Sequence, residues 1–502
     1  MKKKSKLQKV EQETIPVKYR IYPNLKQRKY LDRCFLSSRI VWNWLLGVQK
    51  DYDRGLTEWV KEKYAKELQK FCKKEGFELS SPFEHEKIKE LKKGEAKKFH
   101  TEVIRLKKEE VFPSVLGIEL LKAIIPNAEE DEIKKMIVNK KNPSASNKTI
   151  NIMDLKRQVK NLREDKPILN QVASQGIHHV PLNLAKAWKA CYDKNRPDSG
   201  EPKFKNKFAK QSFTFDTAKL QGNKLFLPPK SKNIFIKTKV HREMEGEQKT
   251  ITVTKSKTGE YYASVNFRQD VFFPKPKSFS KSSTVGIDLG IKDDYIIMSN
   301  DMGSIKNPKF FKKHERKIAM LNRKLSRSQP NSNSRNKVLH ELNREYEKLS
   351  KAREDFQHKV THQIVTNPNI KAVAVEDLNV KGMTAKNKPK EGENGHYLPN
   401  NQCAKRGQNK ATLDAGFGRV RQMLDYKCKR NGKTFGKVDR FFASSKTCNN
   451  CGHINKELKV SDQYWTCEKC GEHHERNFNA ANNVRDEFIR ASKQKKKTKN
   501  SK

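Results

Sequence analysis

The chain has 502 residues, enough for roughly two to four domains, and its 108 lysines and arginines exceed its 58 acids by a formal net charge of +50. Such an imbalance opposes compaction unless a polyanion offsets it, which favours a nucleic-acid partner over an ordinary solvated surface. No run of about 18 apolar residues is present, and the basic residues are spread along the chain, so a membrane-spanning or membrane-surface protein is excluded.

The first half of the chain begins with a strand and continues with helices. Residues 1–13 are charged, which predicts disorder. Residues 17–21 alternate apolar and basic side chains, which predicts a strand that Pro23 ends. Apolar residues then recur at helical spacing from Leu25, and the Lys- and Glu-rich stretch 57–165 keeps a helical pattern between its prolines.

Strand patterns return between residues 203 and 268. Two alternating runs flank Lys257-Thr258-Gly259, which predicts a hairpin. If these strands pair with the N-terminal strand, they can close one β-barrel with the helices inserted between them. We therefore expect an α+β multidomain protein with a bilobed organisation, in which a β-barrel (1–23 and 196–275) carries an inserted helical lobe (24–195).

The second half also mixes strands and helices. VGIDLGI (285–291) and AVAVEDL (372–378) are apolar runs typical of buried strands, and each holds acids. A long basic helical stretch covers 311–366. Residues 386–410 are rich in Lys, Asn and Gly, which predicts a mobile loop. The last twelve residues, 491–502, hold six lysines, which predicts a disordered basic tail.

Four of the nine cysteines form two CxxC pairs, each followed by glycine and separated by fifteen residues. Two such knuckles supply a tetrahedral shell of four thiolates, which suits structural zinc, whereas a pair of redox motifs is the alternative. The odd total of cysteines argues against a secreted disulfide protein and for a reducing cytoplasm. The expected zinc ligands are Cys448, Cys451, Cys467 and Cys470.

Two acids lie in apolar strands. Asp288 lies inside VGIDLG, and Glu376 closes AVAVE. Burial of a carboxylate costs free energy unless the group is paired or bound to a metal. Either acid alone fits a strand end that faces solvent. Both together, in a basic protein, suggest a phosphodiesterase that holds two Mg²⁺ ions at the scissile phosphate.

One helix combines an apolar stripe with a basic face. Ile318, Leu321 and Leu325 lie at helical spacing within 312–327, so one face can pack while the other follows phosphates. A solvated charged face is the alternative. The candidate nucleic-acid-binding residues of this helix are Lys312, Lys313, Arg316, Lys317, Arg323, Lys324 and Arg327.

Five segments of the second half resemble motifs of the TnpB family, transposon-encoded RNA-guided nucleases, in the family's order. They are GIDLGIKD (286–293), REDFQHKVTHQIV (353–365), VEDLN (375–379), SSKTCNNCG (444–452) and ERNFNAANN (475–483). The miniature type V-F CRISPR effectors share these motifs. YRIYPNLKQ (19–27) and PKFKNK (202–207) resemble the family's N-terminal half. The block 57–165 is longer than a minimal TnpB needs, which favours a CRISPR effector.

The resemblance implies a RuvC nuclease domain of RNase H-like fold, behind a wedge-type barrel and a helical recognition lobe. The RuvC domain would comprise 280–443 and 473–490. A zinc-binding, target-nucleic-acid-binding insertion at 444–472 would divide it. By this resemblance Asp288 and Glu376 are the first two catalytic acids and ligands of catalytic Mg²⁺.

The third catalytic acid of the family is the Asp of an R-D-x-N-A motif, and this chain departs from that pattern. It has Asn477 after Arg476, so an amide stands where the family has a carboxylate. Asn keeps one carbonyl ligand but loses a negative charge, which predicts a weakened metal site. Glu475, two residues before, is expected to face elsewhere on the helix. Arg476 joins the candidate nucleic-acid-binding residues.

The resemblance also implies the partners: a guide RNA, and a DNA target in double-stranded and single-stranded form, with no membrane partner. A nuclease-dead RNA-guided DNA-binding repressor and an RNA-independent, transposon-encoded DNA-binding protein are the alternatives. Asp288 and Glu376 favour an endonuclease, whereas Asn477 favours the repressor. TnpB acts as one copy per guide RNA and type V-F effectors as two, so a homodimer stays open. The expected location is the prokaryotic cytoplasm, with the nucleoid when the protein is bound to DNA.

Overall fold

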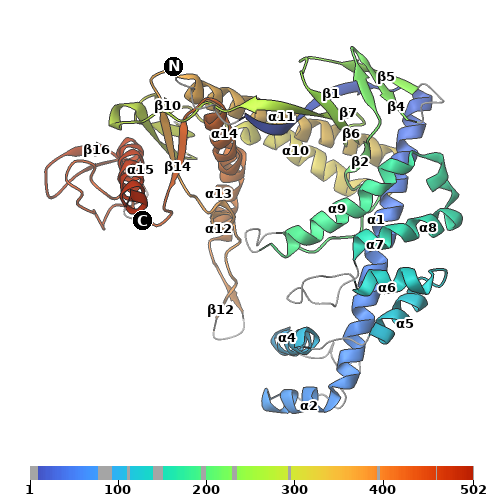
Figure 1. The fold of residues 1–502 in the computed structure, drawn as a ribbon. Helices are drawn as coiled ribbons and strands as arrows, with labels where there is room; N and C mark the ends of the chain where they lie inside the picture. Colours follow the sequence, from blue (N-terminus) through green and yellow to red (C-terminus); the bar gives the residue numbers. More distant parts are fainter. Residues whose placement is uncertain are drawn as a thin grey trace, which may run out of the picture. The chain divides into compact units, whose positions relative to one another are not determined.

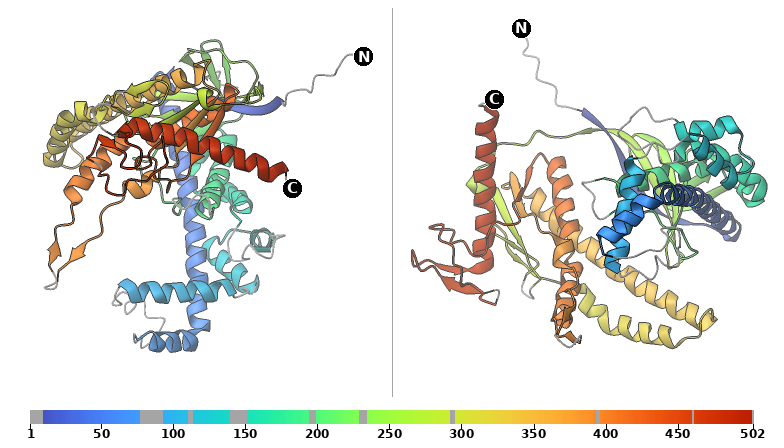
Figure 2. Two further views of the ribbon diagram at one scale, coloured as in Figure 1. Left: turned by 90° about the vertical axis from the view of Figure 1, so that its left-hand side faces the viewer. Right: turned by 90° about the horizontal axis from the view of Figure 1, so that it is seen from below.

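The computed structural model describes most of the chain (Figures 1 and 2). The described residues are 10–76, 93–109, 114–138, 151–193, 199–228, 234–291, 295–392, 396–459 and 461–500. They divide into two compact units, Thr14–Gln269 and a second unit of Met1–Glu13 with Asp270–Lys502. Because both units mix helices and sheets, the predicted multidomain α+β class is confirmed. None of the described helices is long and apolar enough to cross a bilayer.

The unit Thr14–Gln269 is organised along one helix of 39 residues, α1 (Leu25–Lys63). Asn24 and Gln27 form a reciprocal capping box at its start, which fixes where the helix begins. Shorter helices lie along α1 in Figure 1. They are α2 (Ala65–Lys74), α4 (Lys93–Glu109), α5 (Ser114–Ile124), α6 (Glu130–Val138), α7 (Ile152–Leu155), α8 (Val159–Asp165) and α9 (Ser174–Cys191).

The same unit contains a curled seven-stranded sheet with the order β2-β6-β7-β1-β5-β4-β3. Gln248 of β6 hydrogen-bonds the N–H and C=O of Leu220 in β3, both at 2.8 Å, so one side-chain amide joins two strands that are not neighbours in this order. The predicted hairpin at 257–259 is confirmed, because β6 and β7 pair across it. The strands are β1 (Val10–Tyr22), β2 (Gln211–Phe215), β3 (Lys219–Gln221), β4 (Lys224–Leu227), β5 (Ile234–Lys239), β6 (Glu247–Lys255) and β7 (Tyr261–Phe272).

The order of elements in this unit matches the expected insertion, since the helices lie between β1 and β2 along the chain. Closure of the sheet into a barrel stays a prediction. The predicted disorder of 1–13 is wrong for Val10–Glu13, which lie in β1. Lys429 forms a salt bridge with Glu11 at 3.2 Å, and the pairing of this charged strand offsets its low apolar content.

The second unit is built on a five-stranded sheet with the order β10-β9-β8-β11-β14. The strands β8 (Thr284–Leu289), β9 (Ile297–Ser299) and β10 (Gly303–Ile305) are antiparallel neighbours. Strand β11 (Ala372–Glu376) is parallel to β8 and to β14 (Thr434–Val438). The predicted strands at 285–291 and 372–378 are confirmed by β8 and β11.

Helices cover both faces of this sheet. On one face Ile287 and Val375 pack with Val360 of α11 (Asn333–Thr366) and Leu424 of α14 (Phe417–Arg430). On the other face the alternate residues of β11, Ala372 and Ala374, pack with Val484 and Phe488 of α15 (Arg476–Asn500). This alternation is the period of two expected for a strand buried on both faces.

This unit also contains a helix hairpin and several shorter elements. Helix α10 (Phe310–Arg327) packs against α11 as a hairpin, which confirms the predicted basic helical stretch, divided into two helices by residues 328–332. The remaining elements are α12 (Val380–Met383), β12 (Lys390–Glu391), β13 (Tyr397–Leu398), α13 (Gln402–Ala415), β15 (Tyr464–Thr466) and β16 (His473–Glu475).

Two Lys-rich segments differ from the sequence prediction. The predicted loop 386–410 contains β12, β13 and the start of α13, and the predicted disordered tail is helical, because α15 continues to Asn500. Lysine and glutamine are good helix formers, so a helix already anchored by Val484 and Phe488 can extend through them.

Candidate active site and metal centres

Parallel pairing brings the two predicted acids to the same place. Val375 of β11 lies opposite Ile287 of β8, so the next residues, Glu376 and Asp288, are in register on neighbouring strands. Side chains in register on neighbouring strands point to the same face. Because Ile287 and Val375 pack towards α11 and α14, Asp288 and Glu376 point towards the face covered by α15.

Helix α15 lies unusually close to β8. A Cβ at Gly286 would collide with the carbonyl oxygen of Ala481, and a Cβ at Gly436 of β14 would collide with the ring of Phe488. Glycine at these two positions therefore permits the approach of the helix to the sheet. Figure 2 shows α15 crossing beside the strands. The start of α15, where Asn477 lies, is thereby held next to the ends of the two strands.

Both carboxyl groups are destabilised in their charged form. Burial, followed by the charges of Glu376 and Glu475, raises the pKa of Asp288 to about 7, against the effects of a hydrogen bond from Tyr295 (3.1 Å) and the charge of Arg476. Burial also raises the pKa of Glu376. Carboxylates that repel one another in a partly buried place are what a divalent cation would stabilise, and oxygen is the ligand that Mg²⁺ prefers.

Glu376 and the next residue, Asp377, have different kinds of hydrogen-bond partners. The Ser444 hydroxyl donates a hydrogen bond to Oε1 of Glu376, which opposes part of the rise that burial causes in the pKa of Glu376. Asp377 instead accepts from Arg421 at 2.7 Å and from Arg440 at 3.1 Å. Asp377 is therefore paired with two cations, whereas Glu376 accepts its hydrogen bond from a neutral hydroxyl.

The structure places Glu475 in contact with Asn477, which differs from the position that the sequence predicts for Glu475. Asn477 is buried, and its Nδ2 donates to Oε1 of Glu475 at 3.1 Å. Glu475 ends β16 and accepts the backbone N–H of Phe478 at 3.0 Å, so it caps α15. The expectation that Glu475 faces elsewhere on a helix is thus wrong, because it precedes the helix and its charge acts on Asp288.

The four predicted cysteines form one cluster, with their Sγ atoms all within 4.8 Å of one another. The Sγ atoms are 3.6 Å apart both between Cys448 and Cys470 and between Cys451 and Cys467. A tetrahedral shell with zinc–sulfur bonds of about 2.3 Å requires sulfur–sulfur distances of about 3.8 Å, so the cluster fits zinc. Four thiolates around one ion would leave no open coordination position, as in structural zinc sites.

The two knuckles share one backbone geometry. Gly452 and Gly471 have φ of 74° and 70°, in the left-handed region that favours glycine. Each donates its N–H at 2.9 Å to the carbonyl of the first cysteine of its pair, Cys448 or Cys467. The imidazole of His474 contacts this cluster, with Nε2 3.0 Å from Sγ of Cys448. The CxxCG spacing thus predicts the turn as well as the ligands.

Asparagine side chains fasten the first knuckle to α15. Asn483 donates to the carbonyls of Ser444 (2.7 Å) and Thr447 (2.6 Å), and Asn479 also donates to Thr447 (2.7 Å). Asn449 donates its backbone N–H to Asn479 at 3.0 Å. Because Ser444 also contacts Glu376, hydrogen bonds connect the cysteine cluster with the carboxylate pair. Sequence reasoning missed this network, although Asn479 and Asn483 are spaced i, i+4 on one helix face.

Asp486 belongs to the same network. Its carboxylate accepts from Asn449 at 3.1 Å and from Lys281 at 3.0 Å, and it pairs with Arg485 at 2.7 Å. These partners lower the pKa of Asp486. In the structure Asp486 thus connects the first knuckle, through Asn449, with Lys281 and Arg485.

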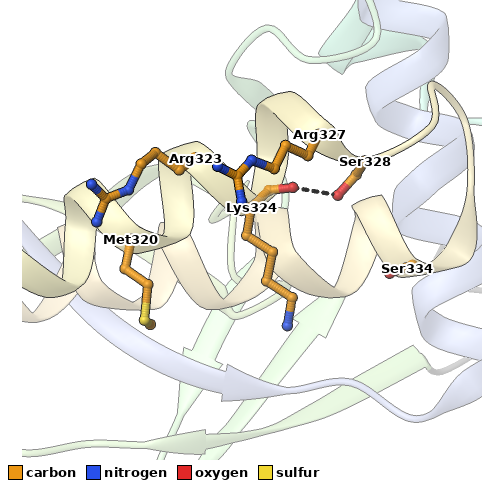
Figure 3. A pocket seen from close by; sticks show the side chains of 6 residues that line it. All are labelled: Met320, Arg323, Lys324, Arg327, Ser328 and Ser334. Carbon is orange, nitrogen blue, oxygen red and sulfur yellow. Dashed lines mark hydrogen bonds between the residues drawn. The ribbon is translucent and has the colours of Figure 1, made fainter.

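The seven predicted basic residues of α10 are all exposed, as expected for a nucleic-acid-binding face. Arg323, Lys324 and Arg327 line an open pocket of about 660 Å³ together with Met320, Ser328 and Ser334 (Figure 3). Lys317 differs, because it forms a salt bridge of 2.7 Å with the buried Glu345 of α11. Lys317 therefore stabilises the helix hairpin, and the other six remain candidates for phosphate contacts.

A strongly basic chain with a partly buried pair of carboxylates and a cluster of four cysteines has the features expected of a metal-dependent protein that acts on nucleic acid. Comparison with known domains agrees with this class. Residues 417–484 match the domain described as "Cas12f1-like, TNB domain", residues 263–387 match "Probable transposase" of the OrfB/IS605 type, and residues 14–54 match "Helix-turn-helix domain". In this chain the last segment folds as β1 followed by the single helix α1.

Two relatives that match about two thirds of the chain have consistent names. "Putative RNA-guided DNA endonuclease" of Streptomyces pristinaespiralis is 27% identical over 324 residues, which cover 64% of this chain and 73% of that protein. "Putative RNA-guided DNA endonuclease InsQ" of Escherichia coli K12 is 28% identical over 320 residues, 63% of this chain and 75% of that protein. The resemblance to TnpB and to the miniature CRISPR effectors, predicted from the motifs, is confirmed by these matches.

Solved structures of RNA-guided nucleases are also similar, at low identity. A Cas12f1-sgRNA-target DNA complex has a TM-score of 0.40 and 13% identity, and the match covers 94% of this chain and 98% of that chain. A CRISPR-Cas_phi3 endonuclease has a TM-score of 0.36 and 12% identity, covering 96% and 94%.

Proposed function

We propose that this chain is an RNA-guided DNA endonuclease with a RuvC-type site that hydrolyses phosphodiester bonds. The names of its relatives support the guided nuclease activity. The observation that carries the choice of site is the register of β8 and β11, which places Asp288 beside Glu376 on the face covered by α15. The strand order, three antiparallel strands followed by two parallel ones, supports an RNase H-like fold for this unit.

In this proposal Asp288 and Glu376 would hold Mg²⁺, which would supply charge stabilisation for the phosphate and a lower pKa for water. Tyr295 orients Asp288 and Ser444 orients Glu376, each through one hydrogen bond. Arg476 carries a positive charge near Asp288, where it can attract the phosphate backbone. Because metal ligands must be deprotonated, the raised pKa of Asp288 makes metal binding weaker below about pH 7.

The domain boundaries follow the same reasoning. The RuvC domain comprises 280–443 and 473–490, and 444–472 forms the zinc-binding insertion that contacts target nucleic acid. Residues 1–23 and 196–275 form the wedge-type barrel, 24–195 form the recognition lobe, and 491–502 form a basic end. The partners are a guide RNA and its DNA target. The assembly has either one or two copies of the chain per guide, which the mass of the purified ribonucleoprotein distinguishes.

A second candidate, a guided DNA-binding repressor, is favoured by one specific observation. The position of the family's third acid is occupied by Asn477, which is 4% exposed and bonded through its amide to Glu475. With an amide there, the acids that act on one another around this site in the described part of the chain are Asp288, Glu376 and Glu475. Binding of target without cleavage would separate this candidate from the endonuclease.

The direct test is guided cleavage of a plasmid by the purified ribonucleoprotein in Mg²⁺. We expect slow cleavage at the guide-matched site, and Asp288→Ala should abolish it while target binding by gel shift stays within about twofold. Asp301→Ala is a matched control, because Asp301 is an exposed acid that follows β9 in the same sheet. If Asp288→Ala cuts as well as the original chain, the RuvC-type site is wrong.

Binding to guide RNA is expected to depend strongly on salt. With six or more phosphate contacts, the association constant should fall about a thousandfold or more between 50 and 200 mM salt. Filter binding over a salt series measures this. Lys324→Gln should reduce the slope of log K against log salt by about one unit, whereas Lys317→Gln should leave it unchanged because Lys317 is paired with Glu345. A flat salt response would contradict the electrostatic interpretation.

A further inference from the structure

The motif PKFKNK (202–207) lies outside the carboxylate site, and the structure fixes it against α1. Trp42 donates its indole N–H to the carbonyl of Lys203 at 3.0 Å. Asn43 pairs with both backbone groups of Lys205, accepting its N–H at 2.8 Å and donating to its carbonyl at 2.9 Å. Two side chains of α1 therefore fasten the backbone of the motif at Lys203 and Lys205.

Lys205 is held in an unusual environment for a cation. Its ammonium lies 3.5 Å from the ring centroid of Trp42, and burial lowers its pKa to about 8. A cation–π contact stabilises a partly desolvated ammonium only in part. Burial of a charge costs free energy unless an opposite charge offsets it. The position of Lys205 therefore suits an anion that binds beside it.

A cavity of about 270 Å³ opens next to Lys205. Its lining includes the cations Arg39, Lys205, Lys210 and Lys255, and the acid Asp32, which forms a 2.8 Å salt bridge with Lys255. The lining thus has an excess of three positive charges. Sites for drug-sized ligands have volumes of about 300 Å³ and upward, and this cavity is slightly smaller. Its size therefore suits a small ligand group, such as a phosphate with part of its sugar.

Aromatic rings flank the same motif on the outside. Phe204 is 54% exposed and Phe208 is 67% exposed, with the ammonium groups of Lys50 and Lys207 5.5 Å and 5.2 Å from their ring centroids. Exposed aromatic side chains that alternate with lysines are the usual platform for unpaired bases, since every base can stack while its phosphate meets a cation. Burial in a core is excluded for these two rings by their exposure.

We propose that the cavity beside Lys205, together with Phe204 and Phe208, binds single-stranded nucleic acid by accommodating one backbone phosphate and stacking an adjacent base. This site is formed by residues of the unit Thr14–Gln269, whereas Asp288 and Glu376 belong to the other unit. The phosphate belongs either to RNA or to DNA, and the cavity itself recognises the chemistry that the two share.

The test is binding of two labelled probes, a 12-nucleotide oligo(U) and a 12-nucleotide oligo(dT), to the full-length chain by fluorescence anisotropy. Lys205→Gln should weaken binding about tenfold or more, and Phe208→Ala by a similar factor. Lys219→Gln is the matched control, because it removes one exposed lysine of the same unit and should change binding less than about twofold. If the variants lose binding to oligo(U) alone, the site is assigned to RNA, and if they lose binding to oligo(dT) alone, it is assigned to DNA. If they lose binding to both probes, the site accepts both kinds of nucleic acid.

A second measurement uses the original chain and so does not depend on the folding of a variant. Lys205 should react with an amine-acylating reagent near pH 8, and saturating oligonucleotide should protect it from the reagent, as read by mass spectrometry. The proposal fails if Lys205→Gln and Lys219→Gln bind both probes alike and Lys205 is not protected. Asp288→Ala should bind both probes normally, so failure of the nuclease proposal leaves this result unaffected.

Discussion

Asn477→Asp is expected to raise RNA-guided DNA cleavage in Mg²⁺ by about tenfold to a hundredfold or more, while target binding stays nearly unchanged. Changes around metal ligands cost tenfold to a hundredfold even when they affect only the partners of the ligands. A restored ligand should therefore gain at least as much. The measurement is single-turnover cleavage of a guide-matched duplex, compared between the original chain and the variant.

A binding readout distinguishes a restored metal site from an incidental gain. In the original chain Nδ2 of Asn477 donates to Oε1 of Glu475, whereas an aspartate would place two carboxylates there. Like charges at this distance repel, so the variant should melt at a lower temperature without divalent metal. Mg²⁺ should raise its melting temperature by more than it raises that of the original chain, because ligand binding to the folded state stabilises it.

Two control variants complete the experiment. Asn482→Asp introduces the same charge on the same helix, and it should change neither cleavage nor the response to Mg²⁺. Asp288→Ala added to Asn477→Asp should abolish the gain. If the original chain already cuts as fast as Asn477→Asp, residue 477 is not the third ligand. Glu475→Gln then becomes decisive, because Glu475 is the other acid whose charge acts on Asp288.

The strands and helices of the second unit could be predicted because each depends on its own sequence. AVAVE is apolar at four of its five positions, and a short strand buried on both faces requires such a run. The register could not be predicted in this way. Asp288 and Glu376 are separated by 88 positions, and only the pairing of Val375 with Ile287 makes them neighbours. The family resemblance supplied that relation, and the geometry agrees with it.

The parts of the site that the sequence did not predict depend on contacts between distant segments. Ser444 lies in the motif SSKTCNNCG, yet its bond to Glu376 exists only because Asn479 and Asn483 dock the knuckle on α15. The errors in Lys-rich segments have another cause. Composition predicts whether a segment can fold alone. The last residues of α15, up to Asn500, instead extend a helix that the preceding residues of α15 have already formed.

Cys448→Ser or Cys470→Ser is expected to expel zinc and to unfold the 444–475 region locally. The binding free energy of structural zinc is folding free energy, so its loss should appear as new protease cleavage within the insertion and as a lower melting temperature. Zinc content is measured by elemental analysis of the purified protein. Cys403→Ser is the matched control, because Cys403 is exposed and lies outside the cluster, and it should retain one zinc per chain.

Loss of zinc should also reduce cleavage, although no cysteine contacts the carboxylates. The first knuckle carries Ser444, which donates to Glu376, and Asn483 holds the backbone of Ser444 at 2.7 Å. Unfolding of the knuckle therefore removes the hydrogen bond that orients Glu376. Ser444→Ala, made in the Asn477→Asp chain, removes that bond alone: it should keep full zinc yet lower cleavage by about tenfold, as expected for a partner of a metal ligand. Ser444→Thr retains a hydroxyl and should restore most of the rate. If both cysteine variants kept full zinc and unchanged melting, the four-thiolate site would be wrong, and if Ser444→Ala cut at the full rate, the connection to Glu376 would have no functional effect.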